Sequence, residues 1–263
     1  MDLDDCKVII VLPAYNAAKT LMRTFDEIPL EYRQHVILVD DASKDDTVAI
    51  AKAAGLTTFQ HERNCGYGGN QKTCYREALA AGADIVVMLH PDHQYDASII
   101  PALVVPIMRG EADAVFGSRM LGGRPLEGGM PRWKYVANVF LTALANIVFE
   151  RYLTEIHSGF RAYSRKYLET VQFEQNSDDF IFDTEIIAQG MMSEMFFSEV
   201  PIVTRYFPEA SSINFRRSVV YGIGILIVLL RYLLHKNRWR RSKKLFPKYL
   251  RDSHIKQRQI VHR

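Results

Sequence analysis

Short apolar segments alternate with helical segments along the first half of the sequence, and this alternation constrains the fold more than any other feature. Strands are predicted at residues 7–12, 36–39, 56–61, 85–89 and 113–117, with helices at 17–27, 43–55, 70–81 and 96–109. Continuous apolar strands of this length, such as KVIIVL and VILV, are typical of a parallel sheet that is covered on both faces. We therefore expect an α/β fold, with a mostly parallel sheet flanked by helices.

The second half of the sequence is less regular. Helices are predicted at 132–152, 165–170, 183–192 and 218–234, a loop at 157–163 (HSGFRAY) and a strand at 196–203. The helix at 132–152 fits either a core helix or one that lies at a membrane surface.

Polar clusters follow four of the predicted strands. They read PAYN (13–16), DDAS (40–43), HPDHQ (90–94) and GSR (117–119). Because ligands bind beyond the carboxyl ends of strands in open α/β sheets, these clusters predict a single site at one edge of the sheet.

Two helix starts affect how this site is interpreted. Ser43, followed three residues later by Asp46, predicts a capping box, and Asn70 is expected to cap the next helix. With Ser43 as the cap, Asp40 and Asp41 are left to bind a ligand, such as a base N–H or a ribose hydroxyl. The alternative is that these carboxylates belong to the acidic start of the helix.

The glycine-rich stretch NCGYGGN (64–70) matches neither a P-loop nor a dinucleotide fingerprint. Because it leads into a predicted helix, its N–H groups could face a phosphate, but a flexible turn is equally consistent with it.

Charge is distributed unevenly along the 263 residues. From Arg231 to the end there are twelve Lys and Arg and one Asp, or +11, so the net charge of +3 leaves about −8 on the rest. Such a basic tail is expected to contact something anionic, although it could also simply be a solvated tail. The negative net charge of the residues before Arg231 argues against nucleic acid as the partner. Three cysteines without CxxC spacing, and a start without a basic n-region, predict a cytosolic chain.

Taken together, the motifs resemble the family 2 inverting glycosyltransferases of the GT-A fold, and most closely the polyprenyl-phosphate branch typified by dolichol-phosphate mannose synthase. The matching segments occur in the family's order across about 200 residues: VLPAYN, VDDASKDDT, NCGYGGNQKT, HPDHQYD, FGSRM, SGFRAY, FDTE and EVPI. The resemblance implies an enzyme with a GT-A domain at 1–217 and an apolar helix with a basic tail at 218–263.

The resemblance also implies a nucleotide-sugar donor, such as a UDP- or GDP-sugar, and a Mg²⁺ or Mn²⁺ ion. The implied metal ligands are Asp92 and Gln94, with His90 where the family often has Asp. A zinc site of His90, Asp92 and His93 is the alternative. The implied donor-binding residues are Pro13, Ala14, Tyr15, Asn16, Asp40, Asp41, Asn64, Gly66, Gly69 and Lys72.

For the acceptor, the resemblance implies a polyprenyl phosphate. The implied acceptor-binding residues are Arg119, Arg132, Lys134, Ser158, Gly159 and Arg161. Asp92, Arg119 and Arg205 are expected to act in catalysis, with Arg205 near the leaving diphosphate or, alternatively, in a surface ion pair. Asp183 or Glu185 would serve as base if the acceptor were a hydroxyl. A hydroxyl-directed transferase and a non-catalytic nucleotide-sugar-binding protein are the other candidates.

The apolar run 219–230 with YLL reaches about sixteen residues, fewer than the ~20 that span a bilayer. With the basic, aromatic segment that follows, it predicts an amphipathic helix that lies on an anionic membrane surface, on its cytoplasmic face.

Overall fold

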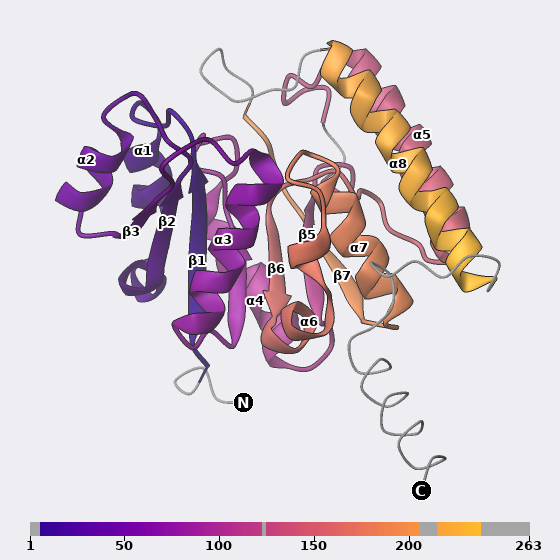
Figure 1. Cartoon of the computed structure of the whole chain (residues 1–263), viewed down its shortest axis with the longest axis horizontal. Helices are drawn as coiled ribbons and strands as arrows, with labels where there is room; N and C mark the ends of the chain where they lie inside the picture. The colour runs from indigo at the N-terminus through magenta and orange to yellow at the C-terminus, as the bar shows by residue number, and fades with distance from the viewer. Residues whose placement is uncertain (1–5, 123–124, 206–214, 238–263) are drawn as a thin grey trace, which may run out of the picture.

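The computed structural model describes residues 6–122, 125–205 and 215–237. Its centre is a seven-stranded sheet in the order β3-β2-β1-β4-β6-β5-β7 (Figure 1). The strands are β1 (Val8–Ala14), β2 (Val36–Asp40), β3 (Thr57–Gln60), β4 (Ile85–Met88), β5 (Ala114–Ser118), β6 (Arg161–Ser164) and β7 (Phe197–Pro201). All are parallel except β6, which confirms the expected α/β class and the mostly parallel sheet.

Helices cover both faces of the sheet. They are α1 (Leu21–Glu27), α2 (Thr47–Ala53), α3 (Tyr67–Ala80), α4 (Ile100–Met108), α5 (Arg132–Phe149), α6 (Arg165–Thr170), α7 (Phe182–Met192) and α8 (Phe215–Lys236), with short 3₁₀ turns at Leu30–His35, Ala97–Ile99 and Phe173–Gln175. Alternate residues of β1 enter different cores, because successive side chains of a strand point to opposite faces. Ile9 and Val11 pack with α3 and α7, whereas Ile10 and Leu12 pack with α1 and α4.

The sheet has its switch point at β1. From there the chain adds β2 and β3 on one side and then returns to add β4 on the other. Loops that leave β1 and β4 at their carboxyl ends therefore diverge, and the crevice between them is where such sheets bind ligands.

The stretch predicted as the loop HSGFRAY contains a strand, so this prediction was wrong in part. Residues Arg161–Ser164 form β6, which pairs antiparallel with both β4 and β5. The segment RAYS has no apolar run that would indicate a strand. It is a strand because it fills the gap between two strands whose edges would otherwise be unpaired.

Both predicted helix caps differ in the structure. Helix α2 begins at Thr47, and the Ser43 hydroxyl accepts a hydrogen bond from the Asn16 backbone N–H at 2.8 Å instead. Helix α3 begins at Tyr67, so Asn70 lies inside it, where its side-chain amide donates to the Val39 carbonyl at 3.0 Å. Both side chains connect strand ends to each other, which sequence spacing does not indicate.

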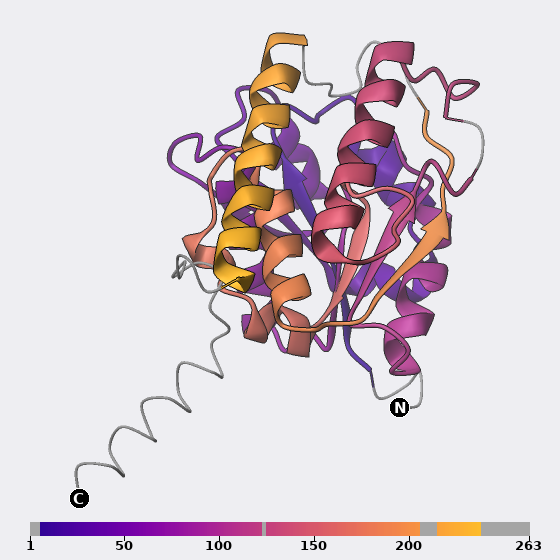
Figure 2. The same cartoon turned by 90° about the vertical axis from the view of Figure 1, so that its right-hand side faces the viewer.

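Helices α5 and α8 lie side by side as an outer layer against the β5–β7 half of the molecule (Figures 1 and 2). One side of α8, including Ile225, Val228 and Tyr232, is buried in the same core as α5 and α7. The predicted boundary at 217/218 therefore falls inside a helix that is part of the main body. Residues Arg216–Lys236 are long and apolar enough to cross a membrane by length and composition alone, contrary to the expected shorter run.

Candidate active site

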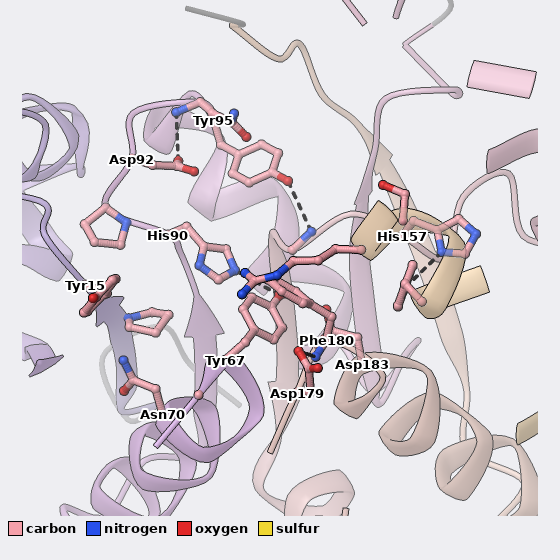
Figure 3. A pocket seen from close by; sticks show the side chains of 18 of the residues that line it. Tyr15, Tyr67, Asn70, His90, Asp92, Tyr95, His157, Asp179, Phe180 and Asp183 are labelled. Carbon is pink, nitrogen blue, oxygen red and sulfur yellow. Dashed lines mark hydrogen bonds between the residues drawn. The ribbon is translucent and has the colours of Figure 1, made fainter. Parts of the chain in front are cut away.

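A cavity of about 810 Å³ opens at the carboxyl edge of the sheet. Its inner part is formed by residues that follow β1 and β4, such as Tyr15, His90 and Asp92 (Figure 3). Its outer part is formed by residues of α5, α8 and the loops beside them. We call these parts the strand half and the helix half.

The strand half contains most of the residues expected to bind the donor. Pro13, Ala14, Tyr15, Asn16, Asp41, Asn64 and Gly66 line it. The Tyr15 ring is 52% exposed and available to contact a planar group. Asn16 is held in the left-handed region, at φ 52°, while its side-chain oxygen accepts from the Lys44 N–H at 2.9 Å.

Asp41 organises the wall of the strand half. Its carboxylate accepts hydrogen bonds from the backbone N–H groups of Cys65 at 2.7 Å and Gly66 at 3.0 Å, and its Oδ1 lies 2.8 Å from His61 Nδ1. Asp40 is fully buried behind this wall, does not line the cavity, and accepts from the Ser43 N–H at 3.0 Å. Of the two expected carboxylates, only Asp41 reaches the cavity.

The glycine cluster does not offer its N–H groups to a phosphate. The N–H groups of Gly68 and Gly69 donate to the Asp178 carbonyl at 2.8 and 3.3 Å. A Cβ at position 68 would lie 2.3 Å from the Ser177 carbonyl oxygen, so glycine is required there for close packing against this loop. Lys72 donates to Asp178 and the Asn176 carbonyl, and neither Gly69 nor Lys72 lines the cavity.

His90, Asp92 and Gln94 all line the cavity, as expected of metal ligands. Asp92 Oδ1 accepts a hydrogen bond from the Gln94 N–H at 3.1 Å. His90 Nε2 lies 3.3 Å from the Tyr67 hydroxyl, so the Nδ1 atom of His90 is the ring nitrogen left for a metal. Burial lowers the pKa of His90, although Asp92 and Asp183 oppose this, so the imidazole is neutral at pH 7. A carboxylate, an amide oxygen and one neutral imidazole suit Mn²⁺ or Mg²⁺.

The alternative zinc site of His90, Asp92 and His93 is not supported, because His93 contacts other residues. Its Nε2 lies 3.2 Å from Arg205 Nη1, and its Nδ1 lies 3.8 Å from Glu27. Among the residues that the structure describes, the one trio of His, Cys, Asp or Glu with its ligand atoms close together is Asp41, His61 and Cys65.

Asp183 lines the cavity but is fully engaged. Its Oδ2 accepts from the Tyr67 hydroxyl at 2.9 Å, while its Oδ1 accepts from Gln71 at 3.2 Å and pairs with Arg161 at 3.2 Å. These contacts use both carboxylate oxygens of Asp183. Glu185 does not line the cavity, and its Oε2 accepts from the Ser177 N–H at 2.6 Å.

The predicted acceptor residues separate into two groups. Arg119, Lys134 and Gly159 line the cavity, whereas Arg132 and Ser158 do not. Arg161 is also outside it, 2% exposed, and donates to the carbonyls of Ser158 at 2.6 Å and Ile156 at 3.0 Å. Arg161 therefore shapes the loop, and the structure gives no direct acceptor contact to it.

Arg119 is held by a buried carboxylate that sequence reasoning missed. Its guanidinium and its backbone N–H donate to Glu155, which is fully buried and also accepts from Asn138 at 2.6 Å. Burial raises the pKa of Glu155, but Arg119 and the hydrogen bonds outweigh it and lower the pKa overall, so the pair is ionised. Glu199 in turn accepts from the N–H groups of Thr154 and Glu155.

Arg205 forms an ion pair at the surface, which was the alternative to a position beside the leaving diphosphate. It is 41% exposed as a side chain, pairs with Glu27 at 2.6 Å, and does not line the cavity. Its expected role beside a diphosphate has no support in this geometry.

The helix half contains further residues that the sequence did not indicate. Trp133, Asn138, His157, Phe180, Arg217 and Tyr221 line it, and Tyr67 and Tyr95 close it on the inside. His157 Nδ1 lies 3.1 Å from the Tyr221 hydroxyl, and its buried Nε2 has no hydrogen-bond partner among the described residues. Burial lowers the pKa of His157 to about 4. Trp133 and Asn138 come from α5, and Arg217 and Tyr221 from α8, so these four residues share one wall through the packing of two helices that are distant in sequence.

Comparison with known proteins identifies the architecture. The profile of Glycosyl transferase family 2 matches residues 9–172. A UDP-N-acetylglucosamine–dolichyl-phosphate N-acetylglucosaminyltransferase of Methanococcus voltae is 27% identical over 219 residues, covering 77% of this chain and 87% of its own length. An uncharacterized protein of Methanocaldococcus jannaschii is 28% identical over 229 residues, which cover 87% and 93% of the two chains.

Solved structures share the fold at lower identity. Glucosyl-3-phosphoglycerate synthase from Mycobacterium tuberculosis, in complex with phosphoglyceric acid, superposes with a TM-score of 0.65 at 20% identity. The match covers 88% of this chain and 81% of that one. The same enzyme has been crystallised with Mn²⁺ and UDP, and matches with a TM-score of 0.64 at 21% identity over 88% of this chain and 79% of that one.

Proposed function

This chain belongs to glycosyltransferase family 2, and we propose that it transfers a sugar, with inversion, from a nucleotide-sugar donor to a polyprenyl phosphate at the cytoplasmic face of a membrane. The family makes it an enzyme. The acceptor, the donor, the metal and the location are inferred from the site.

The strand half is suited to a nucleoside diphosphate. Tyr15 offers an aromatic face, and Asn16 and Asn64 line the same part of the cavity. Asp92, Gln94 and His90 would hold Mg²⁺ or Mn²⁺ close by. When bound, such an ion supplies Lewis-acid stabilisation of the charge that develops on the leaving diphosphate. The Methanococcus voltae relative is named for a UDP-N-acetylglucosamine donor, and the synthase has been crystallised with UDP-glucose, so UDP-sugars are the first donors to test.

The charge of the helix half is the observation that supports a phosphate acceptor. Arg119, Lys134 and Arg217 line it, while Asp183 already has three partners. A hydroxyl acceptor needs a base, whereas a phosphate is anionic at pH 7 and needs only to be positioned by cations. The arrangement therefore favours a phosphate nucleophile.

The two helices beside this cationic wall favour a lipid-linked phosphate. Both helices carry exposed apolar side chains: Val136, Val139, Phe140 and Ile147 on α5, and Val219, Val220, Ile223, Leu226, Ile227, Leu230 and Leu233 on α8. An amphipathic helix of this kind buries its apolar side in the headgroup region of a bilayer. The helix half would then open beside the membrane, where a polyprenyl phosphate presents its headgroup. The basic tail at 238–263, expected to contact anionic lipid, lies outside the described residues.

A donor–acceptor screen with purified full-length protein tests the function. We expect UDP- or GDP-sugar with undecaprenyl or dolichyl phosphate, in Mn²⁺ or Mg²⁺, to give a glycosylated lipid. Phosphoglyceric acid, the ligand of the structurally similar synthase, is the soluble phosphate control. Transfer to a saccharide or lipid hydroxyl, and not to any lipid phosphate, would refute the proposed acceptor. Donor binding without hydrolysis or transfer would indicate a non-catalytic binding protein.

One observation keeps a hydroxyl acceptor as the second candidate. Asp179 is exposed and lines both the main cavity and a smaller one beside the start of α8. Asp179→Asn should leave transfer to phosphate unchanged and abolish transfer to a hydroxyl, so this variant discriminates between the two acceptor classes.

A further inference from the structure

Asp41, His61 and Cys65 form a compact cluster at the edge of the strand half. Each offers one ligand atom, and these atoms lie within 4.8 Å of one another. The three residues come from the end of β2, the turn after β3 and the loop before α3, so only the folded chain brings them together. Asp41 is buried, His61 is half-buried and Cys65 is exposed.

The orientation of the side chains suits a metal ion. His61 Nε2 is 2.9 Å from the Thr73 hydroxyl, and this contact directs Nδ1 toward Asp41 Oδ1, at 2.8 Å. Metal-bound imidazoles are commonly oriented by a hydrogen bond through their second nitrogen. Ligand atoms around a tetrahedral Zn²⁺ lie about 3.3–3.8 Å apart, given Zn–N and Zn–S bonds of about 2.0–2.3 Å. The cluster needs movements of only about 1 Å to reach this spacing.

We propose that Asp41, His61 and Cys65 bind a soft divalent cation, Zn²⁺, at a site separate from the Asp92–Gln94 site. A thiolate and an imidazole select Zn²⁺ over Mg²⁺ and Mn²⁺, which prefer oxygen ligands. On binding, the Cys65 thiol loses its proton, and Asp41 Oδ1 gives up the His61 and Cys65 N–H contacts. Three protein ligands leave a fourth position for water.

The site has a consequence for the donor, and this part depends on the proposed function. Asp41, Asn64 and Gly66 line the strand half, and the N–H groups of Cys65 and Gly66 are bound to Asp41. A Zn²⁺ ion on Asp41 would change the position of this loop. Zn²⁺ would therefore weaken nucleotide binding, whereas Mg²⁺ or Mn²⁺ would support it.

Metal titration of the full chain tests the site directly. We expect apoprotein to bind one Zn²⁺ in the presence of excess Mg²⁺, and Co²⁺ in its place to show a thiolate-to-metal charge-transfer band. Loss of a second-shell partner alone weakens metal binding ~10–100-fold. Cys65→Ser and His61→Gln should each therefore weaken Zn²⁺ binding at least ~10-fold, and Cys65→Ser should abolish the band.

Cys6→Ser and His35→Gln are matched controls, because both residues lie outside the cluster. Thermal unfolding of each variant checks that the fold is retained. Zn²⁺ binding that is unchanged in both cluster variants, or equally reduced by the controls, would overturn the site. Zn²⁺ binding that leaves UDP affinity unchanged would overturn the link to the donor. Neither measurement needs transferase activity, so failure of the proposed function would be seen separately.

Discussion

At the scale of single residues, the cavity separates side chains that face a ligand from side chains that hold other residues in place. Asp92 and Arg119 line it, while Arg161 and Glu155 lie behind it and act through their hydrogen bonds. Sequence motifs do not make this distinction, because one motif can hold both kinds of residue: Asp41 lines the cavity and Asp40 does not, and Gly159 lines it and Arg161 does not. The predictions at this scale test it one residue at a time.

Asp92→Asn should lower turnover by at least ~10²-fold, the scale for losing one preorganised electrostatic group. The change keeps the shape of the side chain but removes a charge from the metal ligand set. Initial rates at saturating Mn²⁺ measure the effect, with Asp96→Asn as control, since Asp96 caps the Ala97–Ile99 turn outside the cavity lining. Wild-type rates for Asp92→Asn would exclude it as a ligand.

Glu155→Gln should raise the KM for lipid phosphate ~10-fold or more and leave donor affinity within about twofold. Glutamine keeps part of the hydrogen bonding to Arg119 but removes the charge that orients its guanidinium. Arg119→Ala should raise the KM for lipid phosphate by a larger factor and also leave donor affinity within about twofold. Glu174→Gln, in an exposed pair with Arg76, is the matched control. Donor affinity that falls in parallel with acceptor KM would place Arg119 in the donor site.

His157 predicts a pH dependence of stability. Its pKa is about 4 in the folded protein because burial disfavours the charged form, and about 6.5 when unfolded. The unfolded chain therefore binds the proton first, and the free energy of unfolding falls as the pH drops from 6.5 to 4, by up to about 3 kcal/mol. Denaturant unfolding of wild type and His157→Gln across this range should show a smaller loss in the variant. An equal pH dependence of the free energy of unfolding in the two proteins would contradict the lowered pKa of His157.

At the scale of secondary-structure elements, α5 and α8 define the helix half and its surroundings. Their facing sides are held by packing such as Phe149 against Tyr232, with ring centroids 4.9 Å apart. Apolar side chains on both helices, such as Phe140 and Ile223, remain exposed. A soluble protein rarely exposes a contiguous apolar patch without a binding role.

Replacing Ile223 and Leu230 together by Gln should weaken vesicle binding by ~10² or more. Each side chain is about half exposed in the protein, and burial of such a side chain in an apolar phase contributes about 1.5–3 kcal/mol. Nucleotide binding and thermal stability should change little. Val203→Gln is the control, because Val203 is 73% exposed but lies on neither helix. Vesicle co-sedimentation that is equal in all three proteins would show that α8 does not contact lipid.

At the scale of the whole molecule, charge and apolar surface are separated along the chain. Residues 238–263 hold ten Lys and Arg against one Asp, next to the apolar helix α8. The electrostatic attraction is worth ~1 kcal/mol for each Lys or Arg near an anionic surface. Apolar burial, by contrast, is not screened by salt. The two contributions can therefore be separated by ionic strength.

Truncation after Asn237 should give a folded protein that binds nucleotide but has lost most of its preference for anionic over neutral vesicles. Raising salt from about 50 to 500 mM should release the full-length protein only in part, because α8 stays engaged after the charges are screened. Co-sedimentation at both salt levels measures this. Equal pelleting of truncated and full-length protein would show that the tail contributes nothing.

The sequence by itself determined the α/β class, the edge of the sheet that holds the site, and the family. Apolar runs such as IVVM and the polar groups after them are local features, and the direction of a strand fixes where its end lies. It also singled out Asp92, Gln94 and Arg119, which lie in the segments after β4 and β5 and line the cavity.

Only the tertiary structure decided which polar residues face the cavity. Asp41 and Asp40 are neighbours with the same chemistry, yet only Asp41 lines it. Glu155 became the partner of Arg119 across 36 residues, and β6 became a strand through pairing with β4 and β5. Hydrogen bonds and packing between distant segments depend on where the folded chain places them, and local propensity and spacing do not contain that information.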